Sequence, residues 1–193
     1  MSCPPYGPRA TRLRRQRGQS LVEFALSSVV LLLLVGGLAD IGRAEFINEA
    51  LSNAAREGAR HGAWFDSPTL SHPYLDDAQI KVAVDADLAA ISLPASVLKN
   101  PGTTCPAPTD GNLFHNPPFA SASFPPVANQ TWLYICYNNT PGLDFSSPAS
   151  GQSQLDLNVI VLYTYGPFTP LISSQFGLFR LAANVHVTVQ GSG

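Results

Sequence analysis

The first third of the chain has the hydrophobic pattern of one long helix. Residues 24–39 form an uncharged, mostly apolar run between two acidic residues. From 41 to 61 there is no proline, and apolar or small residues recur at three- and four-residue spacing, which is the spacing of one helix face. Arg60 suits the negative end of such a helix, and Gly62 suits its stop. We therefore predict a continuous helix from about Gln19 to about His61.

The apolar run has nearly the length of a membrane span. At about 1.5 Å per residue it covers about 24 Å, against about 30 Å for a hydrocarbon core. Including Leu21 and Val22 makes the run long enough if Glu23 is tolerated. Five arginines and no acidic residue precede it: Arg9, Arg12, Arg14, Arg15 and Arg17. The positive-inside bias then keeps the N-terminus in the cytoplasm and sends the remaining chain across the cell membrane.

A secretory signal peptide is the alternative, because it also has a basic start and an apolar middle. Residues 37–39 (Gly-Leu-Ala) have the form of a small-x-small cleavage site. However, Glu23 interrupts the beginning of the apolar run, and the helical pattern continues beyond the cleavage position. We favour a permanent single-pass anchor and keep the signal peptide as the alternative.

Beyond the anchor, the pattern predicts one more helix and three strands. Residues 76–91 carry an apolar stripe at helical spacing: Ile80, Val84, Leu88 and Ile91. Alternating apolar and polar positions predict strands at 132–137, 155–165 and 183–190. Residues 94–148 hold ten of the seventeen prolines, which predicts an irregular excursion around the first strand.

These elements predict the fold class α+β. The alternation of apolar and polar residues in the strands suits an antiparallel sheet with one buried and one solvent-exposed face. We expect helix 76–91 to pack on the buried face. We expect a basic cytoplasmic leader (1–18), a transmembrane helix with its extension (19–61) and an exported head (62–193). A long N-terminal helix followed by an α+β head is a pilin-like layout, which carries no function by itself.

The charge distribution agrees with this layout. The 193 residues have a formal net charge of −2, with 45% hydrophobic and 12% charged residues. This composition argues against a disordered chain and against a nucleic-acid-binding protein. Residues 18–193 carry six basic and thirteen acidic groups, a balance of −7. A basic start, an apolar run and an acidic body are typical of a protein that crosses or leaves a membrane.

Two motifs occur together in the N-terminal helix. Residues 17–26 read RGQSLVEFAL and residues 53–60 read NAAREGAR, with DIGR at 40–43 between them. Over about residues 14–62 this pattern resembles the TadE-like family of the tight-adherence (Flp-type) pilus assembly system. Residues 163–171 (YTYGPFTPL) are more weakly similar to the family's aromatic-proline segment before the last strand.

The resemblance implies a single-pass TadE-like pseudopilin or pilus-assembly protein. Such a protein acts by helix packing and head contacts rather than by catalysis. Its implied partners are membrane lipid and other pilin or pilus-assembly subunits, with a prepilin peptidase as a further partner. The alternative function is an anchored or secreted extracytoplasmic binding module without a pilus role.

The resemblance also implies a processing site. In prepilin-like proteins a membrane peptidase cuts after a glycine, and glutamate is the fifth residue of the mature chain. Gly18 matches the residue before the cut. Gln19 would then be the first residue, Glu23 the fifth and Phe24 the sixth. An ammonium group at Gln19 could neutralise Glu23 of a neighbouring subunit, offsetting the cost of about 2.5–3.5 kcal/mol for a carboxylate in lipid. The alternatives are that the leader is not removed and that Glu23 remains hydrated at the membrane–water interface.

The three cysteines divide unequally across the predicted membrane. Cys3 lies in the cytoplasmic leader, whereas Cys105 and Cys136 lie in the exported head. An even pair in an oxidising compartment predicts one Cys105–Cys136 disulfide, with a chain-entropy contribution of about 3–4 kcal/mol. The alternative is two unpaired thiols, with Cys136 buried in its strand.

No motif for catalysis or cofactor binding occurs in the chain. There is no HExxH, CxxC, Walker A, GxGxxG or GxSxG sequence, and the four histidines are scattered. We therefore predict no enzymatic activity, no cofactor and no metal site.

Overall fold

A computed structural model describes residues 16–64, 76–99, 105–106, 109, 119–137 and 154–190. Contacts divide the chain into two compact units, residues 1–39 and 40–193. One helix, α1 (Gln16–Ala63), contributes to both units without a break. This confirms the predicted long N-terminal helix, which begins three residues earlier and ends two residues later than expected.

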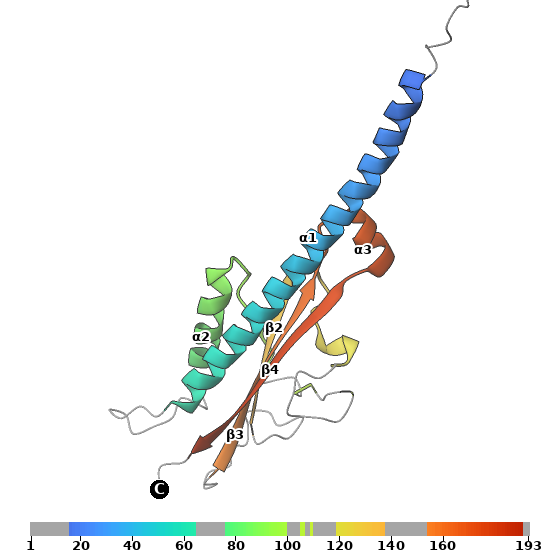
Figure 1. The fold of residues 1–193 in the computed structure, drawn as a ribbon. Helices are drawn as coiled ribbons and strands as arrows, with labels where there is room; N and C mark the ends of the chain where they lie inside the picture. The colour runs from blue at the N-terminus through green and yellow to red at the C-terminus, as the bar shows by residue number, and fades with distance from the viewer. Residues whose placement is uncertain are drawn as a thin grey trace, which may run out of the picture. The chain divides into compact units, whose positions relative to one another are not determined.

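The described part of the first unit is α1 up to Ala39 (Figure 1). Its leucine, valine and phenylalanine side chains are all exposed, from 40% at Leu33 to 72% at Phe24. An 18-residue window of this helix has a mean hydropathy of 2.3 and no buried residue. By length and composition the helix can cross a membrane, a criterion that a signal sequence near the N-terminus also meets.

The second unit is built on a four-stranded sheet of order β1-β2-β3-β4. Its strands are β1 (Val97–Leu98), β2 (Gln130–Tyr137), β3 (Gln154–Tyr165) and β4 (Phe179–Gln190). Strands β2, β3 and β4 are antiparallel, as the alternation predicted. β1 runs parallel to β2, so the sheet is mixed. A strand of two residues is too short to show an alternating pattern, and the sequence therefore did not indicate β1.

Two further helices belong to the second unit. α2 (Asp77–Ala90) occupies the predicted position, and the Asp76 carboxylate caps it by accepting a hydrogen bond from the Gln79 amide at 3.1 Å. α3 (Pro170–Phe176) joins β3 to β4 and was not predicted. Its proline lies in the first turn, where a missing amide hydrogen costs no intrahelical bond.

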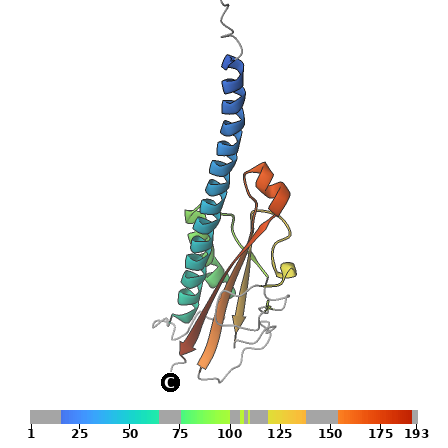
Figure 2. The same ribbon diagram turned by 45° about the vertical axis from the view of Figure 1, so that its right-hand side comes forward.

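The main core lies between the sheet and two helices. The part of α1 from residue 40 onward and α2 both cover one face of the sheet (Figure 1 and Figure 2). The fully buried residues come from α1, α2 and strands β2, β3 and β4, and include Leu51, Ala54, Ala59, Ile80, Val84, Leu88, Leu133, Leu157, Val159, Val161 and Ala183. We expected helix 76–91 as the cover, but α1 shares this role because its apolar stripe continues beyond the uncharged run.

Two glycines allow α1 to pack closely. A Cβ atom at Gly58 would lie 2.5 Å from Val84 Cγ2, and one at Gly62 would overlap Leu157. Gly62 therefore lies inside the helix and permits close packing, rather than ending the helix as the sequence suggested.

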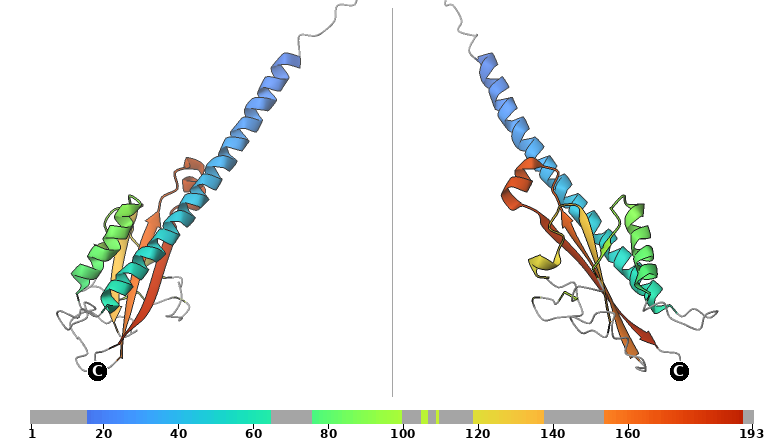
Figure 3. Two further views of the ribbon diagram at one scale, coloured as in Figure 1. Left: turned by 60° about the vertical axis from the view of Figure 1, so that its left-hand side comes forward. Right: turned by 180° about the vertical axis from the view of Figure 1, so that it is seen from behind.

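The opposite face of the sheet carries a second, smaller core. It includes aromatic, aliphatic and cysteine side chains: Cys105, Phe119, Phe124, Tyr134, Cys136, Ile160 and Leu162. The short 3₁₀ helix Ser121–Ser123 lies on this side, across the strands from α2 (Figure 3). The sheet face that was predicted to be solvent-exposed is thus partly buried, because the proline-rich excursion supplies aromatic side chains that pack on it.

Candidate functional site

The predicted processing residues lie together on the first turns of α1. Gly18, Gln19, Glu23 and Phe24 are all helical and exposed. Gln19 and Glu23 are four residues apart, so they share one face of the helix. A Cβ atom at Gly18 would meet nothing within 4 Å. The segment is therefore accessible in the described structure, and cleavage after Gly18 stays a prediction.

A buried carboxylate lies at the beginning of the second unit. Asp40 is the residue that follows the uncharged run, and both of its side-chain oxygens accept hydrogen bonds. The amide of Phe168 donates to Oδ1 at 2.8 Å, and the amide of Thr169 donates to Oδ2 at 2.9 Å. The hydroxyl of Tyr165 also donates to Oδ1, at 3.1 Å. Asp40 thus holds α1 to the β3–α3 connection.

The charge of this carboxylate is stabilised by its donors. Burial raises the pKa of a carboxyl group, but hydrogen bonds from Thr169, Phe168 and Tyr165 outweigh burial and lower the pKa of Asp40 from 3.8 to about 2. Burial and the neighbouring Asp40 raise the pKa of Tyr165, so its hydroxyl stays protonated and donates. The Arg43 guanidinium lies 6.0 Å from the centre of the Tyr165 ring, at cation–π distance.

The sequence did not indicate that Asp40 and its partners form one site. In the sequence, Asp40 ends the uncharged run and belongs to the DIGR motif. Tyr165 and Phe168 entered through the weaker aromatic-proline motif. The two motifs are 125 residues apart at their closest hydrogen-bonded pair, Asp40 and Tyr165, so no local periodicity connects them.

The disulfide lies on the smaller core. Cys105 and Cys136 are bonded, with their Cα atoms 6.1 Å apart, and both are buried. Cys136 is in β2, so the bond ties the proline-rich excursion to the sheet. This is the pairing that the sequence predicted.

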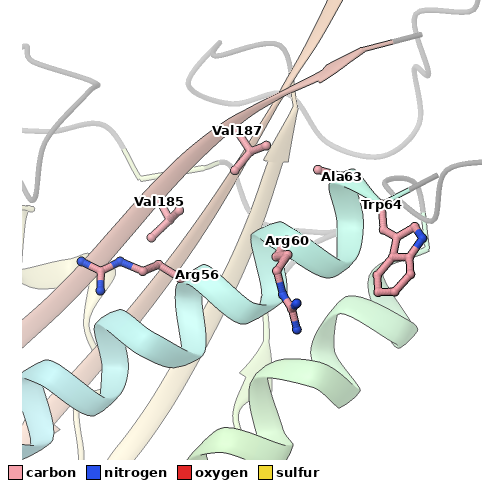
Figure 4. Close-up of a pocket in the computed structure, with 6 residues that line it drawn as sticks. All are labelled: Arg56, Arg60, Ala63, Trp64, Val185 and Val187. Carbon is pink, nitrogen blue, oxygen red and sulfur yellow. The ribbon is translucent and has the colours of Figure 1, made fainter. Parts of the chain in front are cut away.

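A groove of about 550 Å³ lies where the end of α1 meets the edge strand β4 (Figure 4). Its lining combines two arginines with an apolar wall: Arg56, Arg60, Ala63, Trp64, Val185 and Val187. Arg60 forms an ion pair with Glu57 at 2.6 Å, and Arg56 donates to the Asn53 side chain at 3.4 Å. The sequence pattern predicted Arg60 at the end of the helix but did not indicate the groove.

The described residues contain no group of three histidine, cysteine, aspartate or glutamate side chains that could hold a metal ion.

A comparison with known families identifies the N-terminal segment. Residues 18–60 match the family model described as TadE-like protein, which confirms the resemblance suspected from the sequence. The matched segment begins at Gly18 and includes Glu23 and Asp40. No curated protein and no solved structure matches the chain. The strands of the head lie outside the matched segment.

Proposed function

We propose that this protein is a single-pass TadE-like pseudopilin of a tight-adherence pilus assembly system in the cell membrane. The observation that carries the proposal is the coincidence of the family match with an exposed apolar helix. The match covers residues 18–60, and the uncharged run at 24–39 lies within it. Membrane anchoring and an association with pilus assembly both follow from this one segment.

The charge and the disulfide support an orientation with the N-terminus in the cytoplasm. Five arginines precede the apolar run, and such clusters stay on the cytoplasmic side. A Cys105–Cys136 bond is typical of an oxidising compartment, which supports a head outside the cytoplasm. The two features lie on opposite sides of the apolar run and support the same topology.

The mode of action is assembly. The apolar surface of residues 24–39 packs against lipid and against the corresponding helices of other subunits. A prepilin peptidase removes the leader after Gly18, and the new amino group of Gln19 pairs with Glu23 of a neighbouring subunit. The start of the family match at Gly18 and the shared helix face of Gln19 and Glu23 support this role. The head then contacts other pilus-assembly components.

A charge-removal variant tests this function. In cells that carry the native pilus system, Glu23→Ala should leave the protein in the membrane fraction but reduce the yield of surface filaments. We expect a reduction of about tenfold or more, the factor that corresponds to about 1.4 kcal/mol of lost subunit pairing. Filaments are counted by electron microscopy and by immunoblot of sheared material.

Glu45→Ala is the matched control, because Glu45 is also an exposed glutamate of α1 but lies beyond the apolar run. This variant should give a wild-type filament yield. Equal filament yields for both variants would contradict the role of Glu23. They would favour the alternative of an anchored binding module without a pilus role.

A further inference from the structure

Apolar side chains are exposed at the β3–α3–β4 connection of the head. Phe168 is 83% exposed, Leu178 45% and Phe179 37%. These three residues, which we call the apolar foot, flank the short helix α3 on both sides. Phe179 is paired with Tyr165 in the sheet, and their ring centroids are 6.3 Å apart, so the start of β4 lies beside the end of β3 that contacts Asp40. Exposed phenylalanine and leucine side chains at such a place are typical of a surface that contacts a partner or a membrane.

The position of the apolar foot relative to the membrane follows from the hydrogen bonds of Asp40. Asp40 directly follows the uncharged run, so it lies at the boundary of the hydrocarbon when residues 24–39 span the membrane. Its carboxylate accepts hydrogen bonds from the backbone of Phe168 and Thr169 at 2.8 and 2.9 Å. The connection that carries Phe168 is therefore held at the same depth as Asp40.

The headgroup layer on each side of a bilayer is about 5–8 Å thick, which is about the reach of a phenylalanine side chain from its backbone. We propose that the apolar foot enters the interfacial layer of the bilayer that holds α1, so that the head rests on the membrane through Phe168, Leu178 and Phe179. This proposal depends on the membrane anchoring proposed above.

The charges around the foot suit a phospholipid surface. Arg43, on the helix turn after Asp40, and Arg180, next to Phe179, are both exposed. Arginines at this depth can bind lipid phosphates while the aromatic rings enter the boundary with the acyl chains. The only carboxylate in the hydrogen-bonded cluster described above is that of Asp40, and its two oxygens are occupied by donors from the protein.

Site-directed spin labelling of the full chain tests this contact. Each variant carries Cys3→Ser and one new cysteine for the nitroxide, while the Cys105–Cys136 disulfide is kept. The protein is reconstituted in nanodiscs of phosphatidylcholine with a minority of phosphatidylglycerol. Collisions with oxygen, which concentrates in lipid, are compared with collisions with a water-soluble nickel chelate. The test position is Phe168→Cys, which replaces an exposed side chain and keeps the backbone bond to Asp40.

Two matched positions calibrate the experiment. Leu31→Cys reports on the middle of the uncharged run. Val82→Cys is an exposed apolar position of the head, 69% exposed on α2. Its neighbours Ile80 and Val84 pack against Gly62 and Gly58, which are about 30 Å along α1 from Asp40. Val82 should therefore be in water.

We expect oxygen collisions to dominate at position 31, nickel collisions to dominate at position 82, and position 168 to show an oxygen-to-nickel ratio well above that of position 82. A ratio at position 168 equal to that at position 82 overturns the apolar foot if position 31 is in lipid. If position 31 is also in water, the proposed membrane anchor itself is wrong. The two failures are thus distinguishable.

Discussion

The two halves of α1 belong to one helix but are built for different surroundings. Before Asp40, the large apolar side chains point in all directions and are exposed. After Asp40, apolar residues are confined to one face, and residues such as Leu51 and Ala54 are fully buried against the sheet and α2. A helix that is apolar all round suits lipid, whereas an apolar stripe suits a protein core. One continuous helix thus combines a segment with the composition of a membrane span and a segment that completes the core of the head.

Asp40 marks the change between these two halves. A carboxylate at that point ends the uncharged run, and three donors from the β3–α3 connection stabilise it. The point at which α1 changes from exposed apolar surface to core packing is therefore also a tertiary contact.

The same leucine truncation should have a large effect on head stability in the second half of α1 and almost none in the first half. Leu51→Ala removes a fully buried side chain and should destabilise the head by about 2–5 kcal/mol through lost burial and a cavity. Leu31→Ala removes an exposed side chain and should change head stability by less than about 0.5 kcal/mol. Urea unfolding of the detergent-solubilised protein measures both. Equal shifts would mean that residues 40–63 do not form part of the head core.

Glycine substitutions test the close packing of the second half. Gly58→Ala places a methyl group against Val84 and should destabilise the head by about 1–3 kcal/mol. Gly42→Ala, in the same helix, meets no atom within 4 Å and should stabilise by about 0.5–1 kcal/mol through reduced backbone entropy. Thermal unfolding of the two variants gives the comparison. A Gly58→Ala protein as stable as wild type would show that α1 packs less closely on α2.

Removal of the Asp40 charge should weaken the contact between α1 and the β3–α3 connection. In Asp40→Asn the side chain replaces one accepting oxygen with a donor, so an amide of the connection loses its partner, at a cost of about 1–3 kcal/mol. Glu45→Gln, an exposed acid on the next turn, is the control and should be neutral. Hydrogen exchange at the Phe168 and Thr169 amides should accelerate in Asp40→Asn alone. Unchanged exchange there would contradict the contact.

The same contact predicts a pH dependence. The pKa of Asp40 is lowered from 3.8 to about 2 in the folded protein, so its stabilising contribution is complete above about pH 5 and is lost as the pH falls toward 2. This lowering of the pKa corresponds to about 2 kcal/mol of stability. Wild-type protein should lose more stability than Asp40→Asn over this acidic range, and urea midpoints at several pH values measure the difference. Parallel pH profiles would argue against an ionised Asp40.

Most of the long elements could be predicted from local pattern. The uncharged run, helix 76–91 and the three longer strands each have a period or composition that extends over several residues. The sequence did not predict β1 and α3, because these elements are too short to show such a pattern. Residues 41–61 have apolar side chains at helical spacing, but this pattern alone did not show against which part of the protein they pack.

The candidate site divides in the same way. Gly18, Glu23 and Phe24 lie within seven consecutive residues, so a motif could indicate them together. The hydrogen bonds of Asp40 join residues separated by more than 120 positions and depend on the path of β3 through the sheet. The apolar foot likewise depends on the connection of β3 to β4. The sequence therefore indicated the part of the site whose residues are close together in the chain, but not the parts whose residues are far apart in the chain.

The most direct test of the account is the N-terminus of the protein recovered from its native membrane, determined by intact mass and terminal sequencing. We expect a chain that begins at Gln19 and retains the uncharged run. A chain that begins at Asp40 would contradict it, because the run would then be a removed signal peptide and the head would have no anchor. A chain that begins at Met1 would keep the anchor but contradict processing after Gly18.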